Sequence, residues 1–181
     1  GTRKSLRRKI NKATRRLASN EFQVKSSADE LEIESAIGIL KDLHTRRWNS
    51  LGKPGIFADA QFEDFLETAV FEFHQQQKCE IIVAFENDTP IAAQLYFVSS
   101  DGFQLYQSGY APEAMNLEPG HLLFTSIVQR AIRRNDPYLD FLRGNEPYKE
   151  FWGAEPHAQS KLRMVASKPL PLMMARIVEL S

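Results

Sequence analysis

The densest group of chemically useful side chains lies between residues 140 and 153. Asp140 ends a strand-like run, and Arg143, Glu146, Tyr148 and Lys149 follow it closely around a glycine. A carboxylate and a phenol side by side can act as general base and general acid. The two cations are suited to binding anionic groups. The segment therefore predicts a site for proton transfer beside a charged ligand.

The same segment is also consistent with a purely structural role. In this alternative the charges form a salt-bridged loop, with Tyr148 and Trp152 as packing anchors. What favours a site is its position just beyond the carboxyl end of a strand, where open α/β sheets commonly bind ligands. Both interpretations stay open at this point.

A second candidate is the helix start formed by Pro119, Gly120, His121 and Leu122. Free backbone N–H groups at a helix N-terminus attract anions, and a glycine allows a phosphate to come close. Proline also suits the first helical turn. The alternatives are an ordinary helix start and a half-exposed surface histidine.

A third candidate is the end of a strand, Tyr106-Gln107-Ser108-Gly109-Tyr110. Gly109 predicts either a β-bulge or a close approach of the backbone to a ligand. Tyr110 and Gln107 are then candidates for substrate contacts. Strand aromatics are also common in cores, so a packing role is the alternative.

The hydrophobic periodicity predicts the elements that must position these residues. An antiparallel meander is followed by a helix and then by a strand that can pair in parallel with the meander's last strand, with a right-handed crossover. We therefore expect a mixed α/β domain. The predicted helices are 4–19, 29–43, 59–77, 118–134, 147–152 and 169–180, and the predicted strands are 22–24, 81–85, 91–98, 103–110, 138–142 and 161–166.

Composition excludes several classes of protein. The single cysteine, Cys79, rules out an intramolecular disulfide and a multi-cysteine zinc site, and its apolar neighbours predict a buried small hydrophobe. The four histidines are scattered, so we expect no metal. No apolar run is long enough for a membrane span, and the basic start lacks the apolar stretch of a secretory signal, so we expect neither. We expect a reducing, cytoplasmic setting.

The net charge of zero, from 23 basic and 23 acidic residues, conceals a strong asymmetry. All the charged side chains of residues 1–16 are basic, which leaves the rest of the chain acidic. Such a helix can contact the phosphates of RNA, of an anionic membrane or of a nucleotide-bearing cofactor. Docking on an acidic neighbouring surface is the alternative. The basic residues are Arg3, Lys4, Arg7, Arg8, Lys9, Lys12, Arg15 and Arg16.

The order of elements, together with Pro119-Gly120 and the segment Asp140-Phe141-Leu142-Arg143-Gly144-Asn145-Glu146-Pro147-Tyr148-Lys149, resembles the GNAT-superfamily acyltransferases. The similarity is greatest to the CelD-type branch of cellulose and exopolysaccharide biosynthesis proteins, in which Trp152-Gly153 also has a counterpart. The basic segment from Ser5 to Ala13 is similar to the helix that opens the second half of such proteins. Fem-type aminoacyl transferases carry a comparable segment.

This resemblance implies a GNAT-like fold, a mixed and mostly antiparallel sheet flanked by helices, that transfers an acyl group to an amine. Acetyl-CoA or another acyl-CoA would lie between two diverging parallel strands, with its pyrophosphate at Gly120, His121 and Leu122. The superfamily's usual pyrophosphate loop is Gln/Arg-x-x-Gly-x-Gly/Ala, and this sequence has only the single Gly120 near that position.

The resemblance also implies roles for the side chains. Glu146 or Asp140 would be the base, and Tyr148 the acid that protonates the leaving thiolate. Arg143, Lys149, Tyr110 and Gln107 would contact substrate. The implied acceptor is a small amine or an amino sugar of envelope or exopolysaccharide metabolism.

Two alternatives to this function remain at the level of sequence. One is a Fem-type transferase that uses aminoacyl-tRNA, and the other is a GNAT-like domain without catalysis in a polysaccharide-synthesis system. We expect residues 1–181 to form a single domain. Because a charged helix follows Gly1 directly, we also expect the C-terminal part of a longer protein, partnered by a preceding GNAT-like half or by a second copy.

Overall fold

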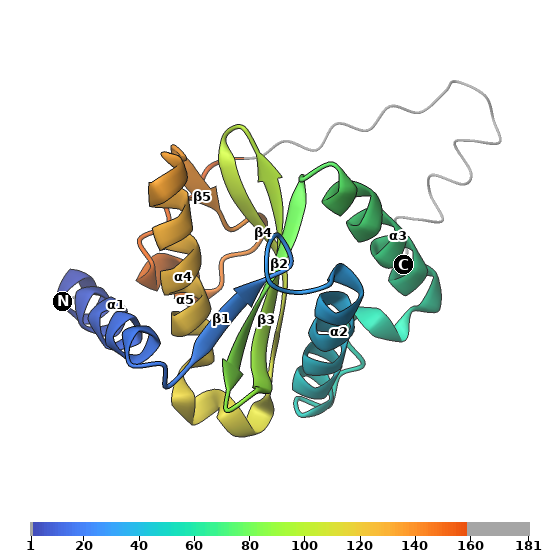
Figure 1. Cartoon of the computed structure of the whole chain (residues 1–181), viewed down its shortest axis with the longest axis horizontal. Helices are drawn as coiled ribbons and strands as arrows, with labels where there is room; N and C mark the ends of the chain where they lie inside the picture. The colour runs from blue at the N-terminus through green and yellow to red at the C-terminus, as the bar shows by residue number, and fades with distance from the viewer. Residues whose placement is uncertain (1, 159–181) are drawn as a thin grey trace.

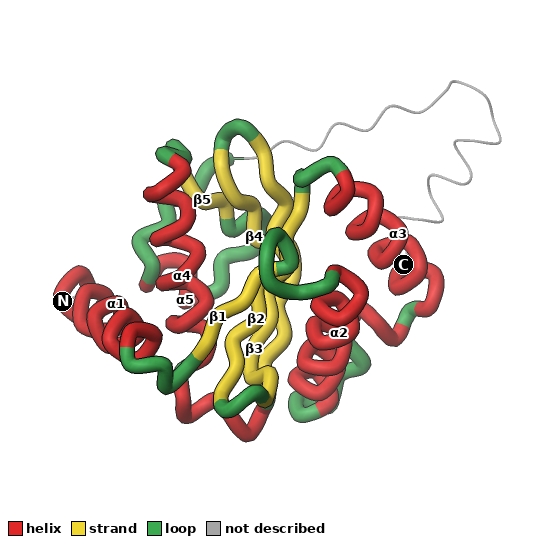
Figure 2. The backbone as a smooth tube through the Cα atoms, in the orientation of Figure 1, coloured by secondary structure: helices red, strands yellow, loops and turns green. Residues whose placement is uncertain are grey.

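The computed structural model describes residues 2–158, and its centre is one twisted sheet (Figures 1 and 2). The strand order is β1-β2-β3-β4-β5, in which β1 to β4 pair antiparallel and β5 pairs parallel with β4. The predicted meander and the parallel last pair are both confirmed. The strands are β1 (Gln23–Ser26), β2 (Cys79–Glu86), β3 (Thr89–Ser99), β4 (Gly102–Tyr110) and β5 (Tyr138–Asp140).

Helices cover both faces of this sheet. Figure 1 shows α1, α4 and α5 on one side and α2 and α3 on the other. The predicted fold class, a mixed α/β domain with a mostly antiparallel sheet flanked by helices, is confirmed. The helices are α1 (Thr2–Ala18), α2 (Ile33–Asn49), α3 (Ala60–Gln75), α4 (Pro119–Arg134) and α5 (Pro147–Phe151), with the 3₁₀ turns η1 (Ile56–Ala58) and η2 (Pro112–Leu117).

Helix α2 packs directly on the backbone of β4. A Cβ atom added to Gly109 would lie 2.4 Å from the backbone nitrogen of His44, so only glycine fits there. His44 is buried, and its Nδ1 donates to the carbonyl of Ser108 at 3.0 Å while its Nε2 accepts from Ile56 N–H at 3.4 Å. The close approach predicted at Gly109 is therefore an approach of helix α2.

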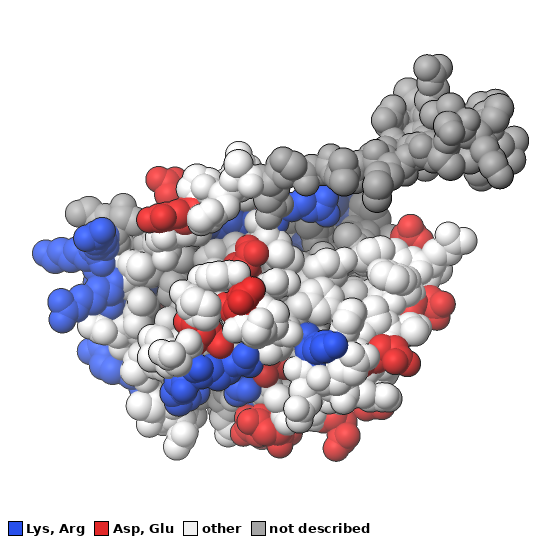
Figure 3. Space-filling view, turned by 90° about the horizontal axis from the view of Figure 1, so that it is seen from above, with Lys and Arg blue, Asp and Glu red and all other residues white. Residues whose placement is uncertain are grey.

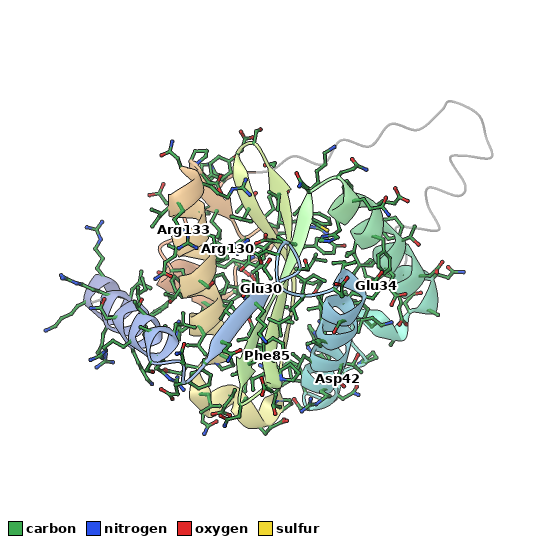
Figure 4. The ribbon with its side chains drawn as sticks, viewed as in Figure 1. Glu30, Glu34, Asp42, Phe85, Arg130 and Arg133 are labelled. Carbon is green, nitrogen blue, oxygen red and sulfur yellow. The ribbon has the colours of Figure 1, made fainter. Side chains whose placement is uncertain are left out.

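Helix α4 is attached to the opposite face by a partly buried ion pair. Arg130 donates to the carboxylate of Glu80 on β2 at 3.0 Å and lies 3.9 Å from Asp29. Figure 4 shows Arg130 over the sheet near the loop that carries Glu30. Burial raises the pKa of the Glu80 carboxyl, and the charge of Arg130 opposes that rise. This pair fixes the register of α4 across the strands.

Some predicted boundaries were wrong. Glu32, and not Asp29, precedes the first turn of α2. The last strand ends at Asp140, since Leu142 takes a left-handed conformation with φ +54°. The strand predicted at 161–166 and the helix at 169–180 lie outside the described residues.

Cys79 is buried in β2, as predicted. Its thiol is 3% exposed and donates to the carbonyl of Val70 at 3.3 Å. Burial raises its pKa to about 11, so the thiol is unreactive at neutral pH. Within the described part of the chain, every helix is too short or too polar to cross a lipid bilayer.

Candidate functional site

The candidate site lies where β4 and β5 separate. The two strands pair over only three positions, ending at Gln104 and Asp140. A β-bulge then inserts Tyr106 into β4, because Leu95 pairs with Gln107 while Tyr96 pairs with Leu105. Bulges bend a strand and re-aim its side chains. We call the region between residues 105–110 and residues 141–148 the β4–β5 splay.

Asp140 shapes this splay rather than standing free in it. Its Oδ1 accepts a hydrogen bond from the backbone N–H of Leu142 at 2.7 Å. That bond supports the left-handed conformation of Leu142, which turns the chain away from β4. One oxygen of the predicted alternative base is therefore already used in a turn.

Tyr148 stands at the edge of the splay on α5. Its ring packs against Phe124 and Phe141, with centroid distances of 5.8 and 5.9 Å, and 40% of the residue is exposed. Burial, followed by the neighbouring Tyr110 and Glu146, raises the pKa of Tyr148 well above its usual range. Its phenol therefore carries a proton at neutral pH, which is the form needed by a general acid.

Tyr110 brings a second phenol to the same place from β4. Its oxygen accepts a hydrogen bond from Gln94 Nε2 at 3.0 Å. A Cβ atom added to Gly120 would lie 3.6 Å from the same oxygen, so the first turn of α4 contacts this ring. Burial raises the pKa of Tyr110. Strand, helix start and α5 thus converge on the two phenols.

Gln107 does not join this group. It pairs directly with Leu95, and directly paired residues of antiparallel strands share a face. Ser108 pairs with Gln94, which lies on the face of Tyr110. Gln107 is therefore on the α2 side of the sheet, opposite to Tyr110.

Lys149 holds the loop that precedes α5. It is 7% exposed, and its ammonium donates to the carbonyls of Arg143 at 2.6 Å and Gly144 at 3.3 Å and pairs with the Glu146 carboxylate at 2.9 Å. An ammonium has three donors, and these oxygens match all of them. Lys149, predicted to contact substrate, is thus directed toward its own loop.

Arg143 and Glu146 are the exposed charges of this loop. No hydrogen bond or ion pair engages the Arg143 guanidinium within residues 2–158. The hydrogen bond from Lys149 lowers the pKa of Glu146, so its carboxylate is ionised at neutral pH. The loop therefore offers one free cation and one ionised acceptor beside Tyr148.

The start of α4 is polar on one side and aromatic on the other. His121 packs on Phe151 and Trp152, with centroid distances of 5.5 and 5.6 Å. Burial, and then the charges of Lys9 and Lys12, lowers the pKa of His121. Its buried Nδ1 has no hydrogen-bond partner among residues 2–158.

Leu122 contributes to the core at this helix start, since its side chain is 1% exposed. Only its backbone N–H is therefore available to an anion. Together with Gly120, Leu122 gives the first turn of α4 two of the three backbone donors that the sequence predicted, and the first turn of a helix carries partial positive charge. The third, the N–H of His121, already donates to the carbonyl of Glu118 at 2.9 Å.

Helix α1 brings cations to the same helix start, a place that sequence reasoning did not specify for them. Lys9 and Lys12 form ion pairs with Glu118, the residue that precedes α4. Arg16 donates to the carbonyl of Leu117 at 2.7 Å. The available signal was their spacing, since residues 9, 12 and 16 lie on one face of a helix.

The opposite side of α1 is exposed and basic. It lines an open hollow of about 850 Å³, and the lining residues within 2–158 include no acidic side chain. Figure 3 shows Lys and Arg side chains gathered at this end of the molecule. The lining residues are Lys4, Ser5, Arg7, Arg8, Asn11, Thr14 and Arg15.

These features fit a ligand that joins a phosphate to an apolar arm. The α4 start offers backbone donors, and Lys9 and Lys12 neutralise the one carboxylate beside it. The splay offers aromatic walls and two phenols. Across residues 2–158, no cluster of three or more histidine, cysteine, aspartate or glutamate side chains is arranged to hold a metal ion.

Comparison with known structures gives the same fold. A GCN5-related N-acetyltransferase from Ralstonia eutropha JMP134 superposes with a TM-score of 0.62 at 12% identity, covering 79% of this chain and 98% of that one. A predicted acetyltransferase from Clostridium acetobutylicum, solved with acetyl-CoA, gives 0.55 at 12% identity, covering 79% and 95%.

A third similar structure is an aminoglycoside acetyltransferase from an uncultured soil metagenomic sample, in complex with sisomicin. Its TM-score is 0.54 at 12% identity, covering 81% of this chain and 98% of that chain. Among curated proteins, none matches the chain at a significant level.

The sequence profile of the family described as "Acetyltransferase (GNAT) domain" matches residues 1–150. This match covers the sheet, the helices described within residues 2–158 except the last residue of α5, and the whole β4–β5 splay. The chain therefore belongs to the GNAT acetyltransferase domain family.

Proposed function

We propose that this chain transfers an acetyl group from acetyl-CoA, or a related acyl group, to the amine of a small molecule. The observation that carries the proposal is the position of Tyr148 at the edge of the β4–β5 splay, packed against Phe124 of α4 and Phe141. An acyl donor that extends from the start of α4 into the β4–β5 splay would have its thioester near the Tyr148 phenol. The family membership of the chain supports the same reaction.

The donor would be held by the first turn of α4. Backbone N–H groups of Gly120 and Leu122 would bind the pyrophosphate, which is the usual way that helix starts bind phosphates. The N–H of His121 donates to the Glu118 carbonyl, so His121 would contribute through its ring. Lys9 and Lys12 add positive charge there. The arm that ends in the thioester would run along β4 toward Tyr110 and Tyr148.

The proposed reaction begins when the neutral amine attacks the thioester carbonyl carbon. A carbon–nitrogen bond forms, and negative charge develops on the carbonyl oxygen. Glu146 accepts the amine proton, directly or through a water molecule. The carbon–sulfur bond then breaks, and Tyr148 gives its proton to the departing thiolate. Solvent returns the proton from Glu146 to Tyr148.

Glu146 is a better candidate base than Asp140. Its carboxylate is exposed, whereas one oxygen of Asp140 is tied to the backbone of Leu142. The lowered pKa of Glu146 keeps it ionised but makes it a weak base. Arg143 beside it would bind an anionic group of the donor or acceptor.

For the acceptor we propose an amino sugar. The resemblance to the CelD-type branch points to envelope or exopolysaccharide metabolism, and a structural relative of the chain holds an aminoglycoside, which is an amine-bearing sugar. Amino sugars and aminoglycosides are therefore the first acceptors to assay.

The donor is tested by calorimetry and thermal shift with acetyl-CoA and coenzyme A. We expect binding that weakens with salt, because Lys9 and Lys12 lie beside the phosphate site. Release of coenzyme A is then followed with a panel of amines. No heat and no thermal shift at millimolar acetyl-CoA would refute the donor assignment.

The acid is tested by Tyr148→Phe. This change is expected to lower kcat by about 10²- to 10⁴-fold, the usual contribution of a general acid. Tyr138→Phe is the matched control, since Tyr138 is an exposed phenol at the start of β5, away from the splay. If the two variants retained equal activity, Tyr148 would not be the acid.

A second candidate function is transfer from aminoacyl-tRNA. The observation that favours it is the exposed basic side of α1, which could bind a phosphate backbone. Arg7, Arg8 and Arg15 lie there, whereas Arg16 is packed over Phe22 at 4.0 Å. Changing the first three to Ala should abolish salt-dependent tRNA binding, and unchanged affinity would exclude this contact.

A domain that binds neither donor would instead serve assembly. In that case the expected finding is a preceding half or a second copy as partner. Light scattering after size-exclusion chromatography measures the oligomeric state directly.

A further inference from the structure

We propose that Gln94 and Tyr96 position the hydroxyl of Tyr110 so that its proton is offered to the acyl donor in the β4–β5 splay. The inference rests on the proposed acetyl transfer and adds two residues to it. Tyr110 would contact the donor, whereas Gln94 and Tyr96 would act through Tyr110 as positioning residues.

The first step is the orientation of the Gln94 amide. Tyr96 donates its hydroxyl hydrogen to Gln94 Oε1 at 2.7 Å, and both residues are completely buried. Because an amide has one oxygen and one NH₂ group, the NH₂ end must then face Tyr110. Gln94 Nε2 is 3.0 Å from the Tyr110 oxygen, which therefore accepts.

The second step concerns the hydrogen of Tyr110. A phenol has one hydrogen, and an oxygen that accepts from an amide directs that hydrogen elsewhere. The hydroxyl of Ser108 is the other polar neighbour of this oxygen, and together with the amide of Gln94 it opposes the rise in the pKa of Tyr110. A serine hydroxyl can rotate to accept or to donate, so an acceptor on a ligand can take the Tyr110 hydrogen in its place.

The third step concerns the surroundings of the Tyr110 hydroxyl. The Tyr110 ring contacts the first turn of α4, where a Cβ on Gly120 would lie 3.5 to 3.8 Å from ring atoms and the hydroxyl. The Tyr110 phenol is also one of the groups that raise the pKa of Tyr148. Tyr110 is therefore a neighbour of both the proposed phosphate site and the proposed acid.

A hydroxyl in this place would hydrogen-bond to the thioester carbonyl oxygen. Charge grows on that oxygen when the amine attacks, so the bond strengthens in the transition state. Tyr110 keeps its proton throughout, whereas Tyr148 gives its own to the thiolate. The two phenols would thus have separate roles. The fully buried amide of Gln94 would hold the hydroxyl of Tyr110 in position.

The kinetic test is a double-mutant cycle with acetyl-CoA and the best amine acceptor. Tyr110→Phe should lower kcat about 10- to 100-fold, with a smaller change in KM for acetyl-CoA. Gln94→Met should lower kcat to a similar extent, and the double variant should lose no more than either single one. Tyr106→Phe is the control, since its ring packs on Phe97 on the other sheet face.

Losses in kcat that multiply in the double variant would overturn the proposal, because Gln94 would then act independently of Tyr110. Gln94→Met also orphans the Tyr96 hydroxyl, so its thermal stability is compared with that of Gln94→Met/Tyr96→Phe. When kcat is calculated for the folded fraction alone, a loss of stability cannot explain why the double variant loses no more activity than a single one.

A measurement without substrate separates this inference from the proposed function. The side-chain amide protons of Gln94 are followed by NMR. Tyr110→Phe should shift the hydrogen-bonded proton upfield, and Tyr106→Phe should not. If the shift occurs but acetyl-CoA does not bind, the hydrogen bonds among Tyr96, Gln94 and Tyr110 are confirmed. The proposed acetyl transfer then fails, and with it the role of Tyr110 toward an acyl donor. If the shift is absent, the positioning role is refuted whatever the donor.

Discussion

Replacing Lys149 by methionine tests whether this residue holds the loop before α5 or waits for a ligand. The variant Lys149→Met keeps the length of the stem and removes the ammonium. The carbonyls of Arg143 and Gly144 and the carboxylate of Glu146 lose their common donor. We therefore expect the fold to lose stability even when no ligand is present.

The magnitude follows from the three contacts. A hydrogen bond to a charged group contributes about 1.5 to 3 kcal/mol when both partners are buried. The two carbonyls belong to exposed residues, and the Glu146 side chain is 54% exposed, so water replaces part of each contact and the ion pair adds less than about 1 kcal/mol. We expect the free energy of unfolding to fall by about 2 kcal/mol, and Tm to fall by about 4 to 8 °C.

Urea unfolding followed by circular dichroism measures this change. The midpoint should fall while the m-value stays constant, because the surface exposed on unfolding is nearly the same. Arg143→Met is the matched control, since it removes an exposed cation from the same loop and should change stability by less than about 0.5 kcal/mol. Equal stability of the two variants would show that Lys149 is free for ligand and refute the reasoning.

Three further predictions concern stability and reactivity. Cys79, with its pKa raised to about 11, should be only roughly one part in 3,000 thiolate at pH 7.5 and should react with Ellman's reagent only on unfolding; immediate labelling of the native protein would contradict this. Burial lowers the pKa of His44, so the unfolded state binds more protons and unfolding free energy should decline as pH falls below about 6.5; His44→Gln should flatten that decline between pH 7 and 5, and an unchanged slope would exclude His44 as its source. Gly109→Ala should cost about 3 kcal/mol or more in urea unfolding because its Cβ meets the backbone of α2, whereas Gly38→Ala in open space on α2 should stabilise by about 0.5 to 1 kcal/mol; similar values for both would contradict the packing argument.

The architecture could be predicted because each element has a period that burial enforces. The alternating and apolar runs of β2 to β4 must be strands, and the spacing of Leu123, Ile127 and Ala131 must be a helix. The end of β5 could not be predicted, because it depends on the left-handed conformation of Leu142 and on the turn that Asp140 supports. Neither feature produces a periodic pattern of apolar residues in the sequence.

The candidate site was predicted only in part. The run from Asp140 to Lys149 identified the correct loop, since polar residues and a glycine after a strand are a local signal. The same run gave no sign that the ammonium of Lys149 turns inward, because its partners are backbone carbonyls, which every sequence has. Gln94 was missed for a related reason: its partners Tyr96 and Tyr110 are evident only when β3 and β4 are paired.

The cations of helix α1 compensate for the single glycine at the start of α4. A phosphate loop with one glycine approaches its ligand less closely than a glycine-rich one, and here Glu118 adds a negative charge beside it. Lys9 and Lys12 cancel that charge, and the partial positive charge of the helix start then acts on an anion without opposition. Because these cations come from α1, the helix belongs to the proposed donor site as well as to the surface. The zero net charge of the chain is thus the sum of an acidic body and a helix with two basic sides, one packed against α4 and one in solvent.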